Sequence, residues 1–183
     1  MDVKDILKNQ WKESVCNYDW WVSAGKRNFF IAESLCEKYL TANKNSEIKI
    51  NEFRGSEITK DEQEWSLIHK EVLMFYGFAT ECYLKGLLAK EKTIDVLDDK
   101  KEFTLNEKFT RHISPDFYKS YKNIFPKIDQ GAEKHIKYLY RAVISGKYPF
   151  EKTPEEKFAY TGDFDNTVLF AKSLISSIEK LLQ

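Results

Sequence analysis

The stretch between Thr59 and Lys92 constrains the fold more than any other part of this 183-residue chain. Its middle, from Val72 to Ala89, is apolar on nearly every side when its residues are placed on a helix. A helix without a polar face has to be covered on several sides, so we expect it at the centre of a helical bundle. The sequence Thr59-Lys-Asp-Glu62 has the form of a capping box and predicts where this helix begins.

Three more long helices are predicted on either side of that stretch, at 18–42, at 129–145 and from a cap at Asp163 to the C-terminal end. A short amphipathic piece precedes them at 2–16, segment 43–58 is predicted as a loop, and one or two short helices fall within 104–125. The inner stripe of the helix at 18–42 is predicted to be Trp21, Ala24, Asn28, Ile31, Leu35 and Tyr39. The expected fold is therefore all-α: an up-and-down bundle of four main helices plus short ones. The length of the chain suits a single domain over residues 1–183, with 1–17 as a short N-terminal extension.

Charge and composition exclude several classes of function. Lysine plus arginine equals aspartate plus glutamate at 29 each, which argues against extensive polyanion binding but leaves room for a local basic patch. No phosphate-binding glycine loop is present, and the three cysteines and three histidines lack the spacing of a metal site, so we expect no metal and no cofactor. No secretory signal and no membrane-length apolar run are visible, which predicts a cytoplasmic protein outside the membrane.

Glu81 and Lys85 are the two charges that interrupt the apolar helix. They stand four residues apart with the acid first, the favourable order for an ion pair on a helix. The favoured interpretation is a partly buried pair that fixes how the helix packs or dimerises. The alternative is a polar pocket between helices, in which burial would alter the titration of both groups.

A second group of polar residues lies in the predicted helix at 129–145. Tyr138 and Arg141 share a face beside its apolar stripe, and His135 flanks that stripe. An arginine near tyrosines is more often a surface residue, but it also suits a phosphate or RNA contact. His135 is interpreted as structural, and Arg111-His112 lies in a predicted loop before Pro115.

Three segments of the chain resemble the HEPN family of bacterial proteins. The sequence Phe75-Tyr-Gly-Phe-Ala-Thr-Glu-Cys-Tyr-Leu-Lys-Gly-Leu-Leu88 is similar to the core-helix pattern G-[YF]-A-x-E-x-x-L-K-x-L-L of that family. The segment Arg141-Ala-Val-Ile-Ser-Gly-Lys-Tyr-Pro149 is similar to its late segment, and the predicted helix at 18–42 is similar to its first long helix. The resemblance implies a helical bundle that is commonly a homodimer. It also implies a role in toxin–antitoxin or phage-defence systems, with RNA or a small nucleotidyltransferase as partner.

The chain departs from that family at the catalytic motif. Many HEPN members are metal-independent RNases with the motif R-N-x-x-x-H-x-Y. On this chain Arg141 matches the arginine and Tyr148 the tyrosine, whereas Ala142 replaces the asparagine and Gly146 stands where the histidine should be. Glycine cannot supply the acid–base chemistry of an imidazole. The resemblance therefore implies a binding surface at Arg141 and Tyr148 and no RNase activity.

The expected function is that of a non-catalytic, HEPN-like binding or regulatory protein that engages a partner protein, RNA or a nucleotide. Its polar pocket is predicted from Glu81, Lys85, Tyr138, Arg141 and Tyr148. The alternative is a metal-independent RNase with a non-standard constellation drawn from Arg141, His135 and His112, in which a histidine would have to approach the arginine. A third interpretation is an unrelated bundle with a similar packing pattern.

Overall fold

The computed structural model describes residues 2–51, 59–60, 68–98, 101, 103–145 and 163–183. Its helices are α1 (Val3–Cys16), α2 (Tyr18–Asn51), α4 (His69–Lys90), α5 (Glu107–Thr110), α6 (Pro115–Ser120), α7 (Glu133–Ser145) and α9 (Phe164–Leu182), with a 3-10 turn η2 (Gln130–Ala132) before α7. The described residues contain no strand, only an isolated bridge between Leu97 and Leu105. The all-α prediction is confirmed.

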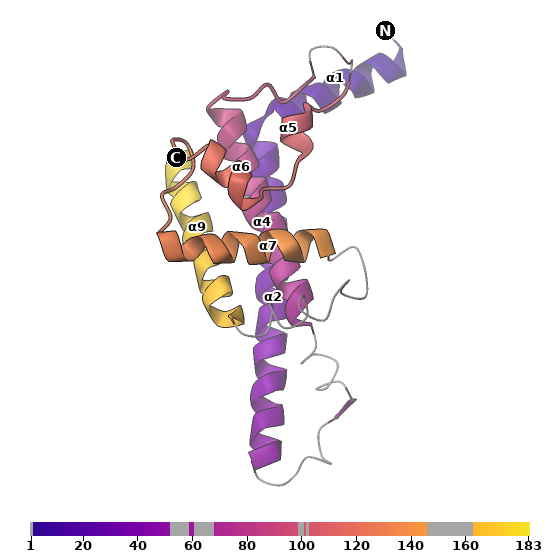
Figure 1. Ribbon diagram of the computed structural model, residues 1–183. Helices are drawn as coiled ribbons and strands as arrows, with labels where there is room; N and C mark the ends of the chain where they lie inside the picture. The colour runs from indigo at the N-terminus through magenta and orange to yellow at the C-terminus, as the bar shows by residue number, and fades with distance from the viewer. Residues whose placement is uncertain (1, 52–58, 61–67, 99–100, 102, 146–162) are drawn as a thin grey trace.

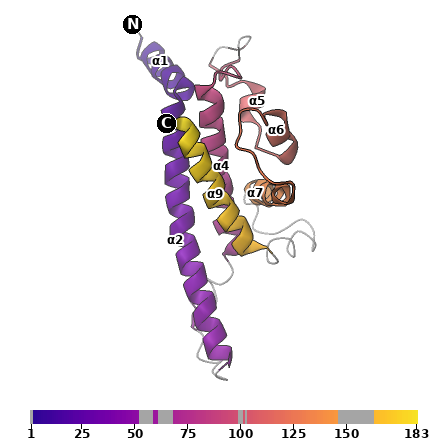
Figure 2. The ribbon, with the colours of Figure 1, turned by 90° about the vertical axis from the view of Figure 1, so that its left-hand side faces the viewer.

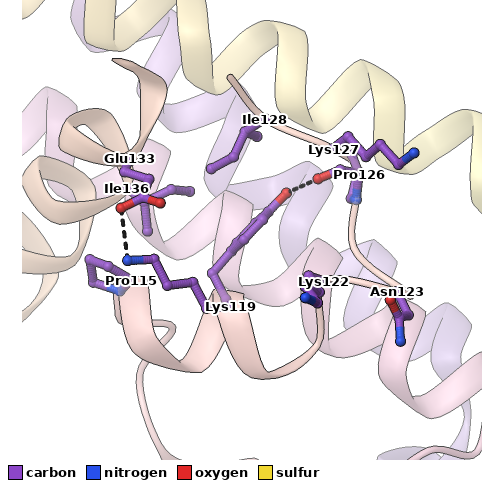
Figure 3. A pocket seen from close by; sticks show the side chains of 10 residues that line it. Pro115, Lys119, Lys122, Asn123, Pro126, Lys127, Ile128, Glu133 and Ile136 are labelled. Carbon is purple, nitrogen blue, oxygen red and sulfur yellow. Dashed lines mark hydrogen bonds and ion pairs between the residues drawn. The ribbon is translucent and has the colours of Figure 1, made fainter. Parts of the chain in front are cut away.

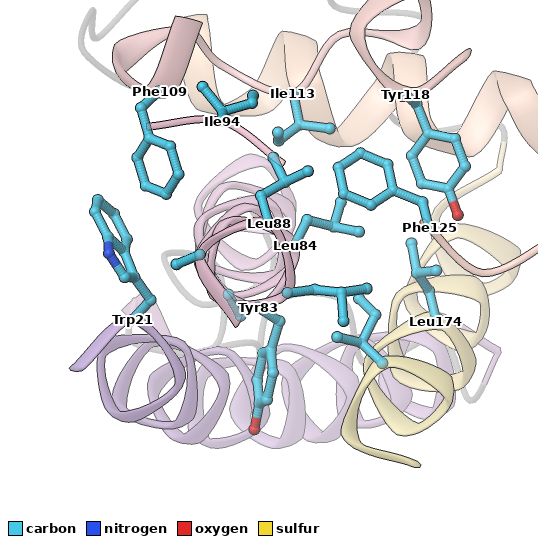
Figure 4. Packing of buried hydrophobic residues seen from close by; sticks show 14 of the residues in the cluster. Trp21, Tyr83, Leu84, Leu88, Ile94, Phe109, Ile113, Tyr118, Phe125 and Leu174 are labelled. Carbon is cyan, nitrogen blue, oxygen red and sulfur yellow. The ribbon is translucent and has the colours of Figure 1, made fainter. Parts of the chain in front are cut away.

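Helix α4 lies at the centre of the bundle, as its sequence predicts. It packs against α2, α7 and α9, and fourteen of its 22 residues are buried. In Figure 4, Leu84 and Leu88 of α4 lie among Trp21 from α2, Leu174 from α9 and the side chains of the segment that follows α4. An apolar helix surface on all sides is thus matched by partners on all sides.

The main helices are not all parallel to one axis. Helix α2 runs antiparallel to α4, since the start of α2 packs near Gly86 while Tyr39 lies beside His69. Helix α9 runs parallel to α4, and the Nζ of Lys90 reaches the carbonyl of Leu181 at 3.1 Å. Figures 1 and 2 show α7 lying across these three helices.

Two glycines of α4 allow its neighbours to approach. A Cβ atom on Gly77 would lie 2.6 Å from Val143 Cγ2 and 2.8 Å from the backbone oxygen of Leu139, both on α7. A Cβ atom on Gly86 would lie 3.1 Å from Val22 Cγ2 on α2. The crossing of α7 over α4 therefore depends on the missing side chain at Gly77.

Three sequence predictions about these elements are wrong in detail. Helix α2 continues to Asn51, so residues 43–51 of the predicted loop are helical, and Figures 1 and 2 show these turns extending past the ends of α4 and α9. Its inner face is also rotated, because Ile31 is 38% exposed whereas Ala32 and Cys36 are buried. Helix α4 begins at His69 and not at Thr59; Ile68 is in a turn, and Asp61 and Glu62 of the capping box lie outside the described residues.

No helix within the described residues is both long and apolar enough to span a membrane.

Candidate functional site

Glu81 is the centre of a buried polar cluster on α4. Its Oε1 accepts a hydrogen bond from Lys85 Nζ at 2.7 Å, so the two residues form the ion pair that their spacing predicts. Its Oε2 lies 2.9 Å from His112 Nδ1. The side chains of Glu81 and Lys85 are only 12% and 6% exposed, whereas that of His112 is 30% exposed. The carboxylate therefore connects a buried ammonium group to an imidazole that reaches the surface.

Segment 106–114, which comprises α5 and the loop that carries His112, begins and ends at a residue that caps the N-terminus of a helix. Asn106 caps α5 by accepting a hydrogen bond from the backbone N–H of Lys108 at 2.9 Å. The hydroxyl oxygen of Ser114 caps α6 by accepting a hydrogen bond from the backbone N–H of Phe117 at 3.1 Å, and Pro115 occupies the first turn of α6. Between the caps, Ile113 is buried in the core and anchors the loop to the bundle. His112 is thereby held against Glu81 by a short segment of chain that both caps and an apolar anchor restrain.

A pocket of about 640 Å³ opens beside His112. Its cationic side chains are Lys108 and Arg111; the Arg111 side chain is 62% exposed and forms an ion pair with Glu107 at 2.5 Å. Aromatic rings come from Phe117, Tyr121 and Tyr140, with hydroxyl groups from Thr110, Ser114 and Ser120 and one carboxylate from Asp116. The pocket therefore combines positive charge, flat apolar surfaces and hydrogen-bond donors, which together suit a phosphate-bearing ligand with a base or ring.

Tyr140 is one of the residues of this pocket that sequence reasoning missed, and it is the one that α7 contributes. It lies on α7 between the buried Leu139 and the candidate Arg141, and it lines both the His112 pocket and a small cavity beside Glu81. Its position in the sequence, off the apolar stripe of α7, gives no sign of this role. Only the crossing of α7 over α4 places its ring beside residues that are nearly 60 positions away in the chain.

His135 has the structural environment that the sequence predicts. Its Nδ1 lies 2.9 Å from Thr167 Oγ1, its ring stacks on Phe170 at a centroid distance of 5.3 Å, and Asp163 is 4.0 Å away. Burial lowers the pKa of His135, with the nearby Asp163 carboxylate opposing that effect. His135 is thus a largely buried imidazole between α7 and α9.

Arg141 and Tyr138 are not joined to the cluster at Glu81. Both are half-buried on α7, Tyr138 contacts the His135 ring edge-on, and neither lines the His112 pocket. Within the described residues, Arg141 makes no hydrogen bond or ion pair, so no such contact links it to His112 or His135. Tyr148 and Gly146 lie outside the described residues. The structure thus brings Glu81, Lys85 and His112 together and leaves Arg141 apart from their contacts.

The cysteines and acidic groups offer little for nucleophilic or metal chemistry. Burial, assisted by the neighbouring charge of Glu81, raises the pKa of the Cys82 thiol to about 11, so this thiol stays protonated at neutral pH. Burial likewise raises the pKa of Cys36. Across the part of the chain that the structure describes, no three His, Cys, Asp or Glu side chains gather as a metal site would require.

Comparison with protein families, with curated proteins and with solved structures finds no match to this chain. The chemistry of the pocket itself therefore has to carry the functional interpretation.

Proposed function

We propose that this protein is a non-catalytic, HEPN-like binding protein whose His112 pocket holds a segment of single-stranded RNA. One observation carries the proposal: Lys108, Arg111 and His112 converge with three aromatic rings on one pocket of about 640 Å³. Guanidinium and ammonium groups bind phosphates, and aromatic rings stack on bases without regard to sequence. A net charge of zero is compatible with such a site, because only a local group of cations is needed.

The biological setting of this proposal comes from the sequence resemblance alone. HEPN proteins act in the cytoplasm in toxin–antitoxin and phage-defence systems, often beside a small nucleotidyltransferase. A regulatory RNA-binding bundle that lacks the family's catalytic histidine fits that setting as a partner that binds and does not cleave.

A second candidate function is metal-independent RNA cleavage at the same pocket. The observation that favours it is the contact of 2.9 Å between Glu81 Oε2 and His112 Nδ1, since a carboxylate that orients an imidazole is a common arrangement in acid–base catalysis. Nε2 of His112 is then the ring nitrogen that remains for a ligand, and the adjacent Arg111 would contact the phosphate. In this version Arg111, and not Arg141, is the arginine of the site.

The experiment that separates these functions measures binding and cleavage on the same RNA. A fluorescently labelled single-stranded RNA is mixed with the protein in EDTA, anisotropy reports binding, and a denaturing gel reports cleavage. We expect wild type to bind and to leave the RNA intact, and Arg111→Ala to weaken binding about tenfold, since a lost charged phosphate contact costs roughly 1–2 kcal/mol. The matched control is Arg27→Ala, which removes an exposed arginine from α2 and should leave the affinity unchanged.

Other outcomes of that experiment have defined meanings. RNA cleavage that disappears in both Arg111→Ala and His112→Ala would establish the second candidate. Loss of binding in Arg141→Ala with full binding in Arg111→Ala would move the site to the surface that the resemblance implies. A wild-type protein that neither binds nor cleaves RNA would overturn both proposals.

We further propose that the chain forms a homodimer, as the resemblance implies. Three large apolar side chains, Trp20, Phe30 and Ile31, are exposed on the side of α2 that faces away from the buried Gly25 and Ala32. Exposed aromatic and aliphatic residues on one helix face are typical of a surface that a second copy covers.

A further inference from the structure

A second pocket lies on the other side of α6 from His112. It has a volume of about 460 Å³, within the range of pockets that enclose a small organic molecule. Figure 3 shows its walls, which come from α6, from the segment 122–128 after it and from the start of α7. None of its residues takes part in the polar cluster of Glu81, Lys85 and His112, so it is a separate site.

The floor of this pocket is apolar and held in place by other contacts. It is formed by the ring of Tyr118 with Ile128 and Ile136. Tyr118 is buried, its ring packs on Phe125 at a centroid distance of 5.1 Å, and its hydroxyl donates a hydrogen bond to the carbonyl oxygen of Pro126. Because that hydroxyl is already bonded, the ring presents an apolar face that needs no rearrangement to receive a ligand.

The rim of the pocket carries an excess of positive charge. Three lysines line it, and among the described residues only one of them has an acidic partner: Lys119 Nζ lies 2.9 Å from Glu133 Oε2. Lys122 and Lys127 make no ion pair with any described residue, and both are exposed at the mouth. An apolar floor beneath two unpaired ammonium groups complements a molecule with an apolar body and an anionic end.

We propose that this pocket binds a small amphipathic anion, namely an aromatic or aliphatic body with one carboxylate or sulfonate group. The apolar body lies on Tyr118, Ile128 and Ile136, and the anionic group meets Lys122 and Lys127 at the rim. Glu133 stays paired with Lys119 and so does not repel the ligand. This proposal is independent of the proposed RNA binding, because the two pockets share no lining residue.

Two fluorescent probes with the same apolar body test this proposal directly. 8-Anilinonaphthalene-1-sulfonate carries a sulfonate, and N-phenyl-1-naphthylamine has the same rings without it. We expect the sulfonate probe to bind saturably at one site per chain, and octanoate but not octanol to displace it. The double variant Lys122→Gln/Lys127→Gln should weaken the sulfonate probe about tenfold and leave the neutral probe within twofold, since the two exposed ion pairs are together worth about 1.4 kcal/mol. Circular dichroism and the Tm confirm that each variant is folded.

Two further variants locate the site and guard against non-specific binding. Ile128→Ala removes part of the half-buried floor and should weaken both probes. The matched control, Lys26→Gln/Lys180→Gln, removes two exposed lysines from α2 and α9 and should weaken neither probe. An equal loss in the control, no loss in Lys122→Gln/Lys127→Gln, or no saturable binding by wild type would each overturn the proposal.

Discussion

His135 shows how a buried titratable side chain is kept neutral at the centre of this bundle. The hydroxyl of Thr167 donates to the backbone oxygen of Asp163 at 2.8 Å, so its oxygen is left to accept a hydrogen bond from His135 Nδ1. This arrangement assigns the ring proton of the neutral imidazole to Nδ1. Burial lowers the pKa of His135, because the charged form would lose hydration between α7 and α9.

A pH dependence of stability follows from that lowered pKa. Below the unfolded-state pKa of about 6.5, the unfolded chain binds a proton at His135 more readily than the folded chain does. The free energy of unfolding should therefore fall as the pH is lowered from 7.5 to 5.5, and His135→Gln should remove this contribution. Urea unfolding of both proteins at the two pH values measures it. An equal pH dependence in wild type and His135→Gln would contradict this explanation.

At the level of single residues, the sequence predicts contacts within one helix and misses contacts between elements. The Glu81–Lys85 pair follows from a spacing of four residues on a helix. The contact of Glu81 with His112 crosses 31 positions of the chain and depends on how the loop before α6 folds back on α4. Arg141, which both its helix face and the family motif single out, makes no hydrogen bond or ion pair with a described residue.

Single residues also explain where the predicted end and buried face of α2 differ from the observed ones. No glycine or proline occurs between Gly25 and Gly55, so nothing in the chain stops α2 at Ala42, and the polar residues after it continue the helix to Asn51. Glu33 lies off the predicted inner stripe of α2, yet it accepts hydrogen bonds from Tyr76 and from Lys172, the latter at 2.8 Å. Periodicity locates a helix well but fixes the orientation of its buried face only to within a residue.

At the level of elements, Gly77 controls the crossing of α7 over α4. An added methyl group would meet the backbone oxygen of Leu139 at 2.8 Å, and a backbone atom cannot move aside as a flexible side chain can. We expect Gly77→Ala to lower the free energy of unfolding by about 1–2 kcal/mol, since overpacking costs more than the ~1 kcal/mol that alanine gains over glycine within a helix. Chemical unfolding monitored by circular dichroism gives the value.

Gly131 provides the matched control for that substitution. A Cβ atom there meets nothing within 4 Å, and its backbone φ is not positive, so alanine can adopt the same conformation. Gly131→Ala should leave stability unchanged or raise it by up to about 1 kcal/mol, because the unfolded chain loses conformational freedom. If both variants lose the same stability, the effect of Gly77→Ala does not arise from contact with α7.

At the level of the whole molecule, the polar cluster and both pockets lie on the side of α4 that α5, α6 and α7 cover. Helix α6 has only six residues, yet Ser114, Phe117 and Tyr121 face one pocket while Tyr118 and Lys119 face the other. The bundle of α2, α4 and α9 supplies a fixed base, and the short elements placed on it supply the chemistry. Binding residues are commonly carried in this way by short segments on a rigid scaffold.

The opposite side of the molecule, formed by the outer face of α2, is where we expect a second copy to bind. Phe30 is 72% exposed, and burying it with Trp20 and Ile31 in a dimer would remove a large apolar area from water. Sedimentation velocity should show a dimer for wild type, and Phe30→Lys/Ile31→Lys should shift it to a monomer without changing its circular dichroism spectrum. Leu169→Lys, which alters an exposed apolar residue on α9, should leave the dimer intact. The two lysines should break the dimer because a charge at the centre of the interface costs several kcal/mol when it is buried without a partner. A wild-type protein that sediments as a monomer at ~100 µM, or a dimer that the α2 variant leaves unchanged, would exclude this face as the interface.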